Sequence, residues 1–206
     1  MKLYIAPYAP NPRRATMFVA EKGITDIEFV SLNLPAGEHR TDAFRKLSPL
    51  SQIPTLELDD GRALTESRAI CAYLEALYPE PNMMGRDPFE RAQIEMWDRR
   101  TEYLVVLPFM LWMRHGFPAL AAVEKNQNPA VAAYYETQAK TMAHWFDRQL
   151  ADREWIAGDR FTIADITAAC GIDFAKMAKW RPDDTLPNLK RWRDAIAQRP
   201  AGQAAP

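Results

Sequence analysis

The spacing of apolar residues predicts two unlike halves of the chain. Before residue 79, short apolar runs alternate with stretches of helical periodicity, which is typical of a mixed α and β domain. The turn sequence Asp59-Asp60-Gly61 predicts a hairpin between the last two strands. The predicted order is therefore βαβαββα, with strands at residues 3–5, 27–32, 53–58 and 62–64, and helices at 12–22, 43–47 and 66–77.

The first helix carries start and stop residues of its own. Asn11 followed by Pro12 predicts a helix with Asn11 as N-cap and Pro12 as the first helical residue. Gly23 predicts its end, because glycine readily takes the left-handed conformation that closes many helices.

The second half of the pattern is helical throughout. Residues 79–87, rich in proline and glycine, predict a linker. A long helix follows over residues 88–114, with a kink expected at Pro108. Further helices are expected over residues 129–150, from Thr162 and from Pro187, and residues 201–206 are expected to fray.

Composition and charge argue against several classes of function. The 206 residues carry a net charge of -1, so no bulk field favours nucleic acid or an anionic membrane as partner. Two distant cysteines and three scattered histidines argue against a disulfide framework and against a metal site. The N-terminal apolar run is too short for a secretion signal, and no stretch approaches the ~20 apolar residues of a membrane span. We therefore expect a cytoplasmic location.

Three motifs carry a family resemblance. They are Ser-Gln-Ile-Pro-Thr-Leu at residues 51–56, Thr-Glu-Ser-Arg-Ala-Ile at 65–70, and Ala-Gly-Asp-Arg-Phe-Thr-Ile-Ala-Asp-Ile at 157–166. In this order and at these separations they resemble the cytosolic glutathione transferase family over nearly the whole chain. The resemblance implies an α+β fold: a thioredoxin-like glutathione-binding domain at 1–78, a linker at 79–87, and an all-helical domain at 88–206 that holds an electrophilic substrate.

The resemblance also implies the glutathione contacts. The Ile53–Pro54 peptide is expected to be cis, so that the Ile53 backbone pairs with the cysteinyl unit like an added strand. Ser67 and its helix end would hold the γ-glutamyl carboxylate, because a helix N-terminus favours an anion, and Glu66 would take the amino group. The residues expected at the glycyl carboxylate are His39, Arg40 and Gln52.

The catalytic position departs from the usual pattern. Most classes activate the thiol with Tyr, Ser or Cys, but the usual Ser or Cys position falls here on Ala9. Residues 9–14 resemble an atypical branch that lacks all three, in which a helix end and a bound water stabilise the thiolate with help from the helical domain. We expect Tyr4, which lies near the tyrosine position of other classes, to be a core residue.

A rough energy comparison shows that this arrangement suffices. Half ionisation of a thiol at pH 7 needs a pKa shift of ~1.5 units, or about 2 kcal/mol. A helix N-terminus supplies up to ~2 kcal/mol, and one hydrogen bond to the charged sulfur supplies ~1.5–3 kcal/mol. The expected donors are Asn11, through its side chain or the backbone N–H groups near it, and a water held by His115.

Helical spacing predicts one wall of the electrophile site at Tyr103, Leu107 and Leu111. The expected reaction is attack of the glutathione sulfur on a small hydrophobic electrophile, a detoxifying conjugation by a homodimer that needs no metal and no cofactor beyond glutathione as co-substrate. Two alternatives stay open: a glutathione-dependent isomerase or peroxidase, and a non-catalytic interaction module with the same fold. The presence of Gln52, Pro54, Glu66 and Ser67 favours an enzyme, because an interaction module does not need residues that bind glutathione.

Overall fold

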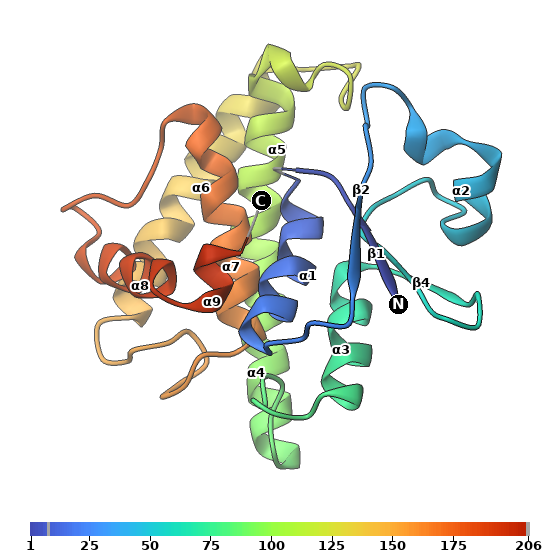
Figure 1. The fold of residues 1–206 in the computed structure, drawn as a ribbon. Helices are drawn as coiled ribbons and strands as arrows, with labels where there is room; N and C mark the ends of the chain where they lie inside the picture. Colours follow the sequence, from blue (N-terminus) through green and yellow to red (C-terminus); the bar gives the residue numbers. More distant parts are fainter. Residues whose placement is uncertain (8, 205–206) are drawn as a thin grey trace. The chain divides into compact units, whose positions relative to one another are not determined.

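The chain folds into two compact units. The computed structural model describes residues 1–7 and 9–204 (Figure 1). The first unit contains the described residues up to Asn82 together with residues 199–204, and the second unit is Met83–Gln198. The chain therefore passes between units inside the expected linker, and its last described segment belongs to the first unit rather than to the helical one.

The first unit is built on a four-stranded sheet in the order β2-β1-β3-β4. β1 runs parallel to β2 and antiparallel to β3, and β3 pairs antiparallel with β4. Helices α1 and α3 lie side by side against one face, and α2 lies on the other side of the sheet (Figure 1). The predicted order βαβαββα is confirmed, with β1 (Lys2–Ile5), α1 (Pro10–Glu21), β2 (Glu28–Ser31), a 3-10 turn η1 (Glu38–Arg40), α2 (Asp42–Leu47), β3 (Thr55–Glu57), β4 (Ala63–Thr65) and α3 (Ser67–Leu77).

Helix α1 begins earlier than the sequence predicted. Its N-cap is Ala9, and Asn11 is the second helical residue, so the prediction that Asn11 caps the helix was wrong. The reason is Pro10, whose fixed φ suits the first helical position and whose ring favours the extended backbone seen at Ala9 (φ -75, ψ 129).

The other end of α1 follows the prediction. Gly23, at φ 63, closes the helix in a Schellman motif. The N–H of Ile24 donates to the carbonyl of Val19 at 3.1 Å, and the N–H of Gly23 donates to that of Ala20 at 3.1 Å.

The C-terminal segment is ordered where fraying was expected. Residues Pro200–Gln203 form a short helix, α9, which packs on α1. The Arg199 guanidinium pairs with the Glu21 carboxylate, which also accepts the N–H of Ala201 at 3.2 Å. The expectation of fraying was therefore wrong for residues 201–203, because the contact with Glu21 joins positions 180 residues apart and leaves no local signal.

The second unit is helical, and its central helix is α7. Every residue of α7 from 163 to 172 is buried, and Trp192, Phe146 and Phe109 of neighbouring helices are buried as well. The helices are α4 (Pro88–Thr101), η2 (Glu102–Val106), α5 (Leu107–Gly116), η3 (Pro118–Leu120), α6 (Pro129–Gln149), α7 (Ile163–Phe174), η4 (Ala175–Ala178) and α8 (Pro187–Ala197).

The long helix predicted over 88–114 is interrupted before Pro108 rather than kinked at it. Residues 102–106 form a π turn, in which the N–H of Leu107 donates to the carbonyl of Glu102. Proline has no N–H and its ring clashes with the carbonyl four residues back, so a wider turn just ahead of Pro108 accommodates it. Gly171 of α7 packs against this turn: a Cβ there would lie 2.8 Å from Cα of Val106.

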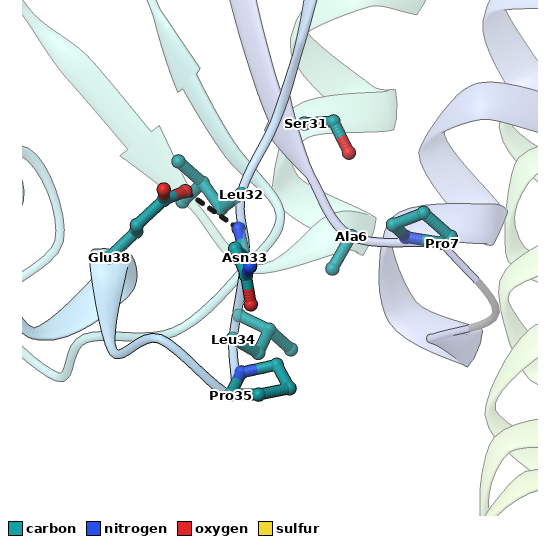
Figure 2. A pocket seen from close by; sticks show the side chains of 8 residues that line it. All are labelled: Ala6, Pro7, Ser31, Leu32, Asn33, Leu34, Pro35 and Glu38. Carbon is teal, nitrogen blue, oxygen red and sulfur yellow. Dashed lines mark hydrogen bonds between the residues drawn. The ribbon is translucent and has the colours of Figure 1, made fainter.

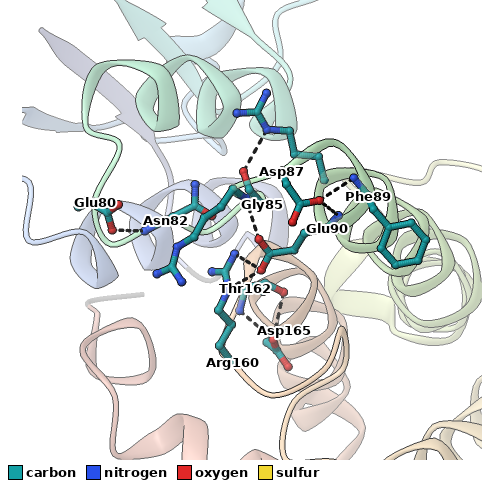
Figure 3. A network of polar contacts seen from close by, with 11 residues as sticks. Glu80, Asn82, Gly85, Asp87, Phe89, Glu90, Arg160, Thr162 and Asp165 are labelled. Carbon is teal, nitrogen blue, oxygen red and sulfur yellow. Dashed lines mark hydrogen bonds and ion pairs between the residues drawn. The ribbon is translucent and has the colours of Figure 1, made fainter.

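The start of α7 is fixed by the predicted capping box. The buried carboxylate of Asp165 accepts the N–H of Thr162 at 3.0 Å, the N–H of Ile156 at 2.9 Å and the indole N–H of Trp192 at 2.8 Å. Figure 3 shows Thr162 and Asp165 close to the ion pair that Arg160 makes with Glu90 of α4. These contacts tie α4, α7 and α8 together, so the motif is structural.

Candidate functional site

Within the part of the chain that the structure describes, one backbone N–H in the first turn of α1 has no hydrogen-bond partner. Pro10 and Pro12 have no N–H, and the N–H of Arg13 already donates to the Ala9 carbonyl at 3.1 Å. The N–H of Asn11, an exposed residue at the positive end of the helix, has no hydrogen-bond partner within residues 1–7 and 9–204. No acidic residue lies in this turn to occupy that end. An anion placed here would meet the helix dipole and a single N–H group.

Tyr4 is committed to another contact. Its hydroxyl donates to the Glu57 carboxylate at 2.7 Å across the β1–β3 pair. That hydrogen bond, helped by burial and by the charge of Glu57, raises the pKa of Tyr4 to about 12. A phenol in this state has little tendency to give up its proton at neutral pH, and its ring packs edge-on against Phe44. Tyr4 is only partly buried, so the expectation of a core residue was wrong, but its hydroxyl is occupied by Glu57.

The turn between β4 and α3 places Glu66 and Ser67. Glu66 is exposed and adopts φ 66 and ψ 110, a left-handed backbone that costs a non-glycine residue on the order of 1–3 kcal/mol. Ser67 is the first residue of α3 and only 4% exposed. Its Oγ accepts a hydrogen bond from the guanidinium of Arg14 at 3.0 Å. This bond fixes the start of α3 beside α1.

The segment before β3 presents a free stretch of backbone. The Ile53–Pro54 peptide is cis, as the resemblance implied. Ile53 lies outside the strand ladder, and its N–H and C=O make no hydrogen bond within the described residues. The carbonyl of the preceding Gln52 accepts the hydroxyls of Ser48 at 2.9 Å and Thr55 at 3.0 Å, which holds the segment in place. The Gln52 side chain is on the exposed surface.

His39 and Arg40 lie together on η1. Arg40 donates through Nε to Nε2 of His39 at 3.1 Å. Because this nitrogen accepts, the hydrogen of the neutral imidazole resides on Nδ1. Burial, and then the charge of Arg40, lower the pKa of His39, which favours that neutral form. The Nδ1 atom is buried and has no hydrogen-bond partner within the described residues, so it is a donor without an acceptor.

A pocket of about 450 Å³ opens at the carboxyl ends of the parallel strands β1 and β2. Figure 2 shows Ala6 and Pro7 facing the segment after β2, where the Glu38 carboxylate accepts the N–H of Asn33 at 2.7 Å. No sequence motif predicted this pocket, because its residues belong to none; the position at the ends of two parallel strands was the only signal. The pocket is lined by Ala6, Pro7, Ser31, Leu32, Asn33, Leu34, Pro35 and Glu38.

The second unit holds the remaining predicted site residues. Tyr103 on η2 is 61% exposed, and Leu107 and Leu111 are partly buried on α5. His115, near the end of α5, accepts the N–H of Asn128 on Nδ1 at 3.2 Å, which leaves the hydrogen of a neutral ring on Nε2. Spacing of four residues places Leu107, Leu111 and His115 along one face of α5.

Two general features of the described chain bear on partners. No helix within residues 1–7 and 9–204 is long and apolar enough to cross a membrane. Within the same residues, no three side chains of the metal-binding types are grouped closely enough to hold an ion.

The thioredoxin-like sheet, the cis-proline segment and the helix starts beside it define the class of glutathione-dependent transferases and isomerases. The family model "Glutathione S-transferase, N-terminal domain" matches residues 8–77, and the model "Glutathione S-transferase, C-terminal domain" matches residues 105–200. The chain belongs to the glutathione S-transferase family and is a glutathione transferase.

Similar proteins agree with this assignment. Glutathione S-transferase 2 of Saccharomyces cerevisiae is 34% identical over 203 residues, covering 98% of this chain and 87% of the relative. Maleylacetoacetate isomerase of Pseudomonas aeruginosa is 29% identical over 214 residues, covering 100% and 95%. The crystal structure of a glutathione S-transferase domain-containing protein from Marinobacter aquaeolei gives a TM-score of 0.91 at 37% identity, covering 98% and 99%.

Proposed function

We propose that the protein conjugates the thiolate of glutathione to small hydrophobic electrophiles, and that the start of α1 and a bound water stabilise this thiolate. The observation that carries the proposal is the N–H of Asn11 at the positive end of α1, which has no hydrogen-bond partner among the described residues. Ala9 offers no side-chain donor, and the hydroxyl of Tyr4 is committed to Glu57. The water would be held by His115.

Glutathione would lie across the first unit in an extended form. The free N–H and C=O of Ile53 suit antiparallel pairing with the cysteinyl unit, beside Pro54. Ser67 and the α3 start would hold the γ-glutamyl carboxylate, with Glu66 at its amino group. The unpartnered Nδ1–H of His39 supports a role at the glycyl carboxylate, together with Arg40 and Gln52.

The electrophile would be small and largely apolar. The pocket beside β1 and β2 supports this, since most of its wall is alanine, proline and leucine. Tyr103, Leu107 and Leu111 are the proposed contacts from the helical unit. In the reaction the sulfur forms a bond to an electrophilic carbon, the leaving group departs with its electron pair, and the protein contributes thiolate stabilisation and positioning.

The ultraviolet absorbance of bound glutathione thiolate, followed against pH, tests the proposal. We expect the bound thiol to ionise near or below neutral pH, and we expect His115→Ala to raise that pKa if the residue holds the water. Ser67→Ala is the binding-defective comparison. A bound thiol that titrates as it does in water would refute thiolate activation, and no binding at all would refute the function.

Glutathione-dependent isomerisation is the second candidate. The similarity to a protein named maleylacetoacetate isomerase favours it. The two reactions differ in their mass balance, because an isomerase regenerates glutathione while a transferase consumes it. Counting free thiol during turnover of a panel of electrophiles and cis-alkene acids separates them. Peroxidase activity would instead produce oxidised glutathione.

The exposed apolar residues of α4 support assembly with a second copy of the chain. Phe89 and Met96, seven residues apart on the same helix face, are 78% and 41% exposed. We propose that they contribute to a twofold homodimer. Light scattering on the wild type and on Met96→Lys tests this: the variant is expected to shift toward a monomer.

The proposed location is the cytoplasm, with a role in detoxification. Cys71 and Cys170 are both buried and form no disulfide, which is the usual state of cysteines in a reducing compartment. Fractionation of the source cells, with an assay of conjugation in each fraction, checks the location.

A further inference from the structure

Helix α1 buries a charged side chain that no motif explained. Arg14 is 2% exposed, whereas its neighbour Arg13 is only partly buried and donates to the Ala204 carbonyl at 3.3 Å. Burying a guanidinium costs several kcal/mol unless its hydrogen bonds are made within the protein. The Nη1 atom of Arg14 makes one such bond, to Oγ of Ser67 at 3.0 Å, in a buried setting.

This bond fixes the direction of the serine hydroxyl. A guanidinium only donates hydrogen bonds, so Oγ of Ser67 must use a lone pair to accept from Arg14. A hydroxyl has one hydrogen, which remains available to donate to another group. Arg14 thereby sets Ser67 as a donor, and the positive charge behind the hydroxyl polarises it in the same sense.

The surroundings of Ser67 suit an anionic acceptor. Ser67 is the first residue of α3, an 11-residue helix with no acidic residue in its first turn. Its N-terminal N–H groups carry the positive end of the helix dipole. The hydroxyl hydrogen of Ser67, the N-terminal end of α3 and the buried guanidinium of Arg14 thus lie together at one helix start.

We propose that Arg14 is a positioning residue for the γ-glutamyl carboxylate of glutathione, acting through the hydroxyl of Ser67. The inference rests on the proposed function, which places that carboxylate at the start of α3. Lysine cannot replace the arginine fully, because an ammonium lacks the planar fork that reaches several acceptors in fixed directions.

The test compares two ligands by calorimetry. One is glutathione, and the other is 4-aminobutyryl-cysteinylglycine, which lacks only the γ-glutamyl carboxylate. The variants are Arg14→Lys and Arg14→Gln, with Arg13→Lys as the matched control on the same helix. We expect the Arg14 variants to bind glutathione about 10- to 100-fold more weakly, since a charge-assisted contact is lost, and to bind the analogue within about twofold of wild type. Arg13→Lys should behave as wild type with both ligands.

The possible outcomes distinguish a failure of this inference from a failure of the proposed function. If the Arg14 variants lose affinity equally for both ligands, Arg14 has a general structural role and the inference is overturned. If the wild type binds neither ligand, the proposed function fails first. Should the variants not fold, arginine signals in the nitrogen-15 spectrum of the wild type decide: the Arg14 signals should move with glutathione and stay in place with the analogue. Equal movement with both ligands contradicts the proposal.

Discussion

Replacing Asn11 by proline should raise the pKa of the bound glutathione thiol, and replacing it by alanine should not. Proline removes the backbone N–H in the first turn of α1 that has no hydrogen-bond partner in the described part of the chain. Alanine removes the side chain and keeps the N–H. The pair of variants therefore separates a backbone donor from a side-chain donor at a single position.

The expected rise in the pKa of the bound thiol follows from the number of hydrogen-bond donors lost. One hydrogen bond to a charged group is worth ~1.5–3 kcal/mol, which corresponds to a pKa rise of about 1–2 units. The helix dipole should survive, because proline is tolerated in a first helical turn and Pro10 and Pro12 already occupy this one. For a wild-type thiol that ionises at about pH 7, this rise should lower the thiolate fraction at pH 7, and with it the conjugation rate, by about five- to fiftyfold.

Thiolate absorbance against pH is the assay, with conjugation rates over the same pH range as a second readout. The rate lost by Asn11→Pro at pH 7 should return at high pH, where the thiol ionises without help. Circular dichroism and the thermal midpoint serve as controls for the fold. The reasoning is refuted if Asn11→Pro leaves the thiol pKa unchanged while glutathione still binds. An equal rise in Asn11→Ala would assign the role to the side chain instead.

Four further predictions concern single residues. Tyr4→Phe should leave the thiol pKa of bound glutathione unchanged, because this phenol has a pKa of about 12; a rise of one unit would contradict this. Lys22→Met should lower the unfolding free energy in urea by about 3–5 kcal/mol, because the fully buried ammonium binds a carboxylate at 2.7 Å and two carbonyls. Asp165→Ala should cost about 3–5 kcal/mol, because three buried N–H groups lose their acceptor, whereas the exposed control Asp152→Ala should cost under about 0.5 kcal/mol. The pKa of His39 lies below its unfolded value, so its contribution to stability is present above about pH 6.5 and is lost as the pH falls through the lower, folded pKa; His39→Gln should remove that part of the pH dependence of unfolding.

Local patterns in the sequence predicted the elements well. The alternation in the strands, the hairpin at residues 59–61 and the helical periodicity all act over a few neighbouring residues, so they can be recognised without the fold. The capping box at Thr162 and Asp165 was predicted for the same reason. What the sequence missed there was the indole N–H of Trp192, which reaches the same carboxylate from 27 residues away.

The predictions from the sequence that were wrong share one cause. Asn11 was misplaced as a cap because two prolines competed for the first helical position, and the structure shows that Pro10 takes it. The break in the long helix falls at the π turn ahead of Pro108, where Gly171 of another helix packs against the turn. The C-terminal residues are held by Glu21 of α1. Each outcome depends on a partner that is distant in sequence.

The candidate site likewise combines features set by local sequence with features set by distant partners. The sequence by itself determined which residue types stand at the helix starts and before β3, since these belong to contiguous motifs. Only the tertiary structure decided that the Tyr4 hydroxyl is occupied by Glu57, that Arg14 lies behind Ser67, and that a pocket opens beside β1 and β2. The two hydrogen bonds each join residues 53 positions apart in the sequence. Their geometry is fixed by packing, and no local sequence pattern predicts packing.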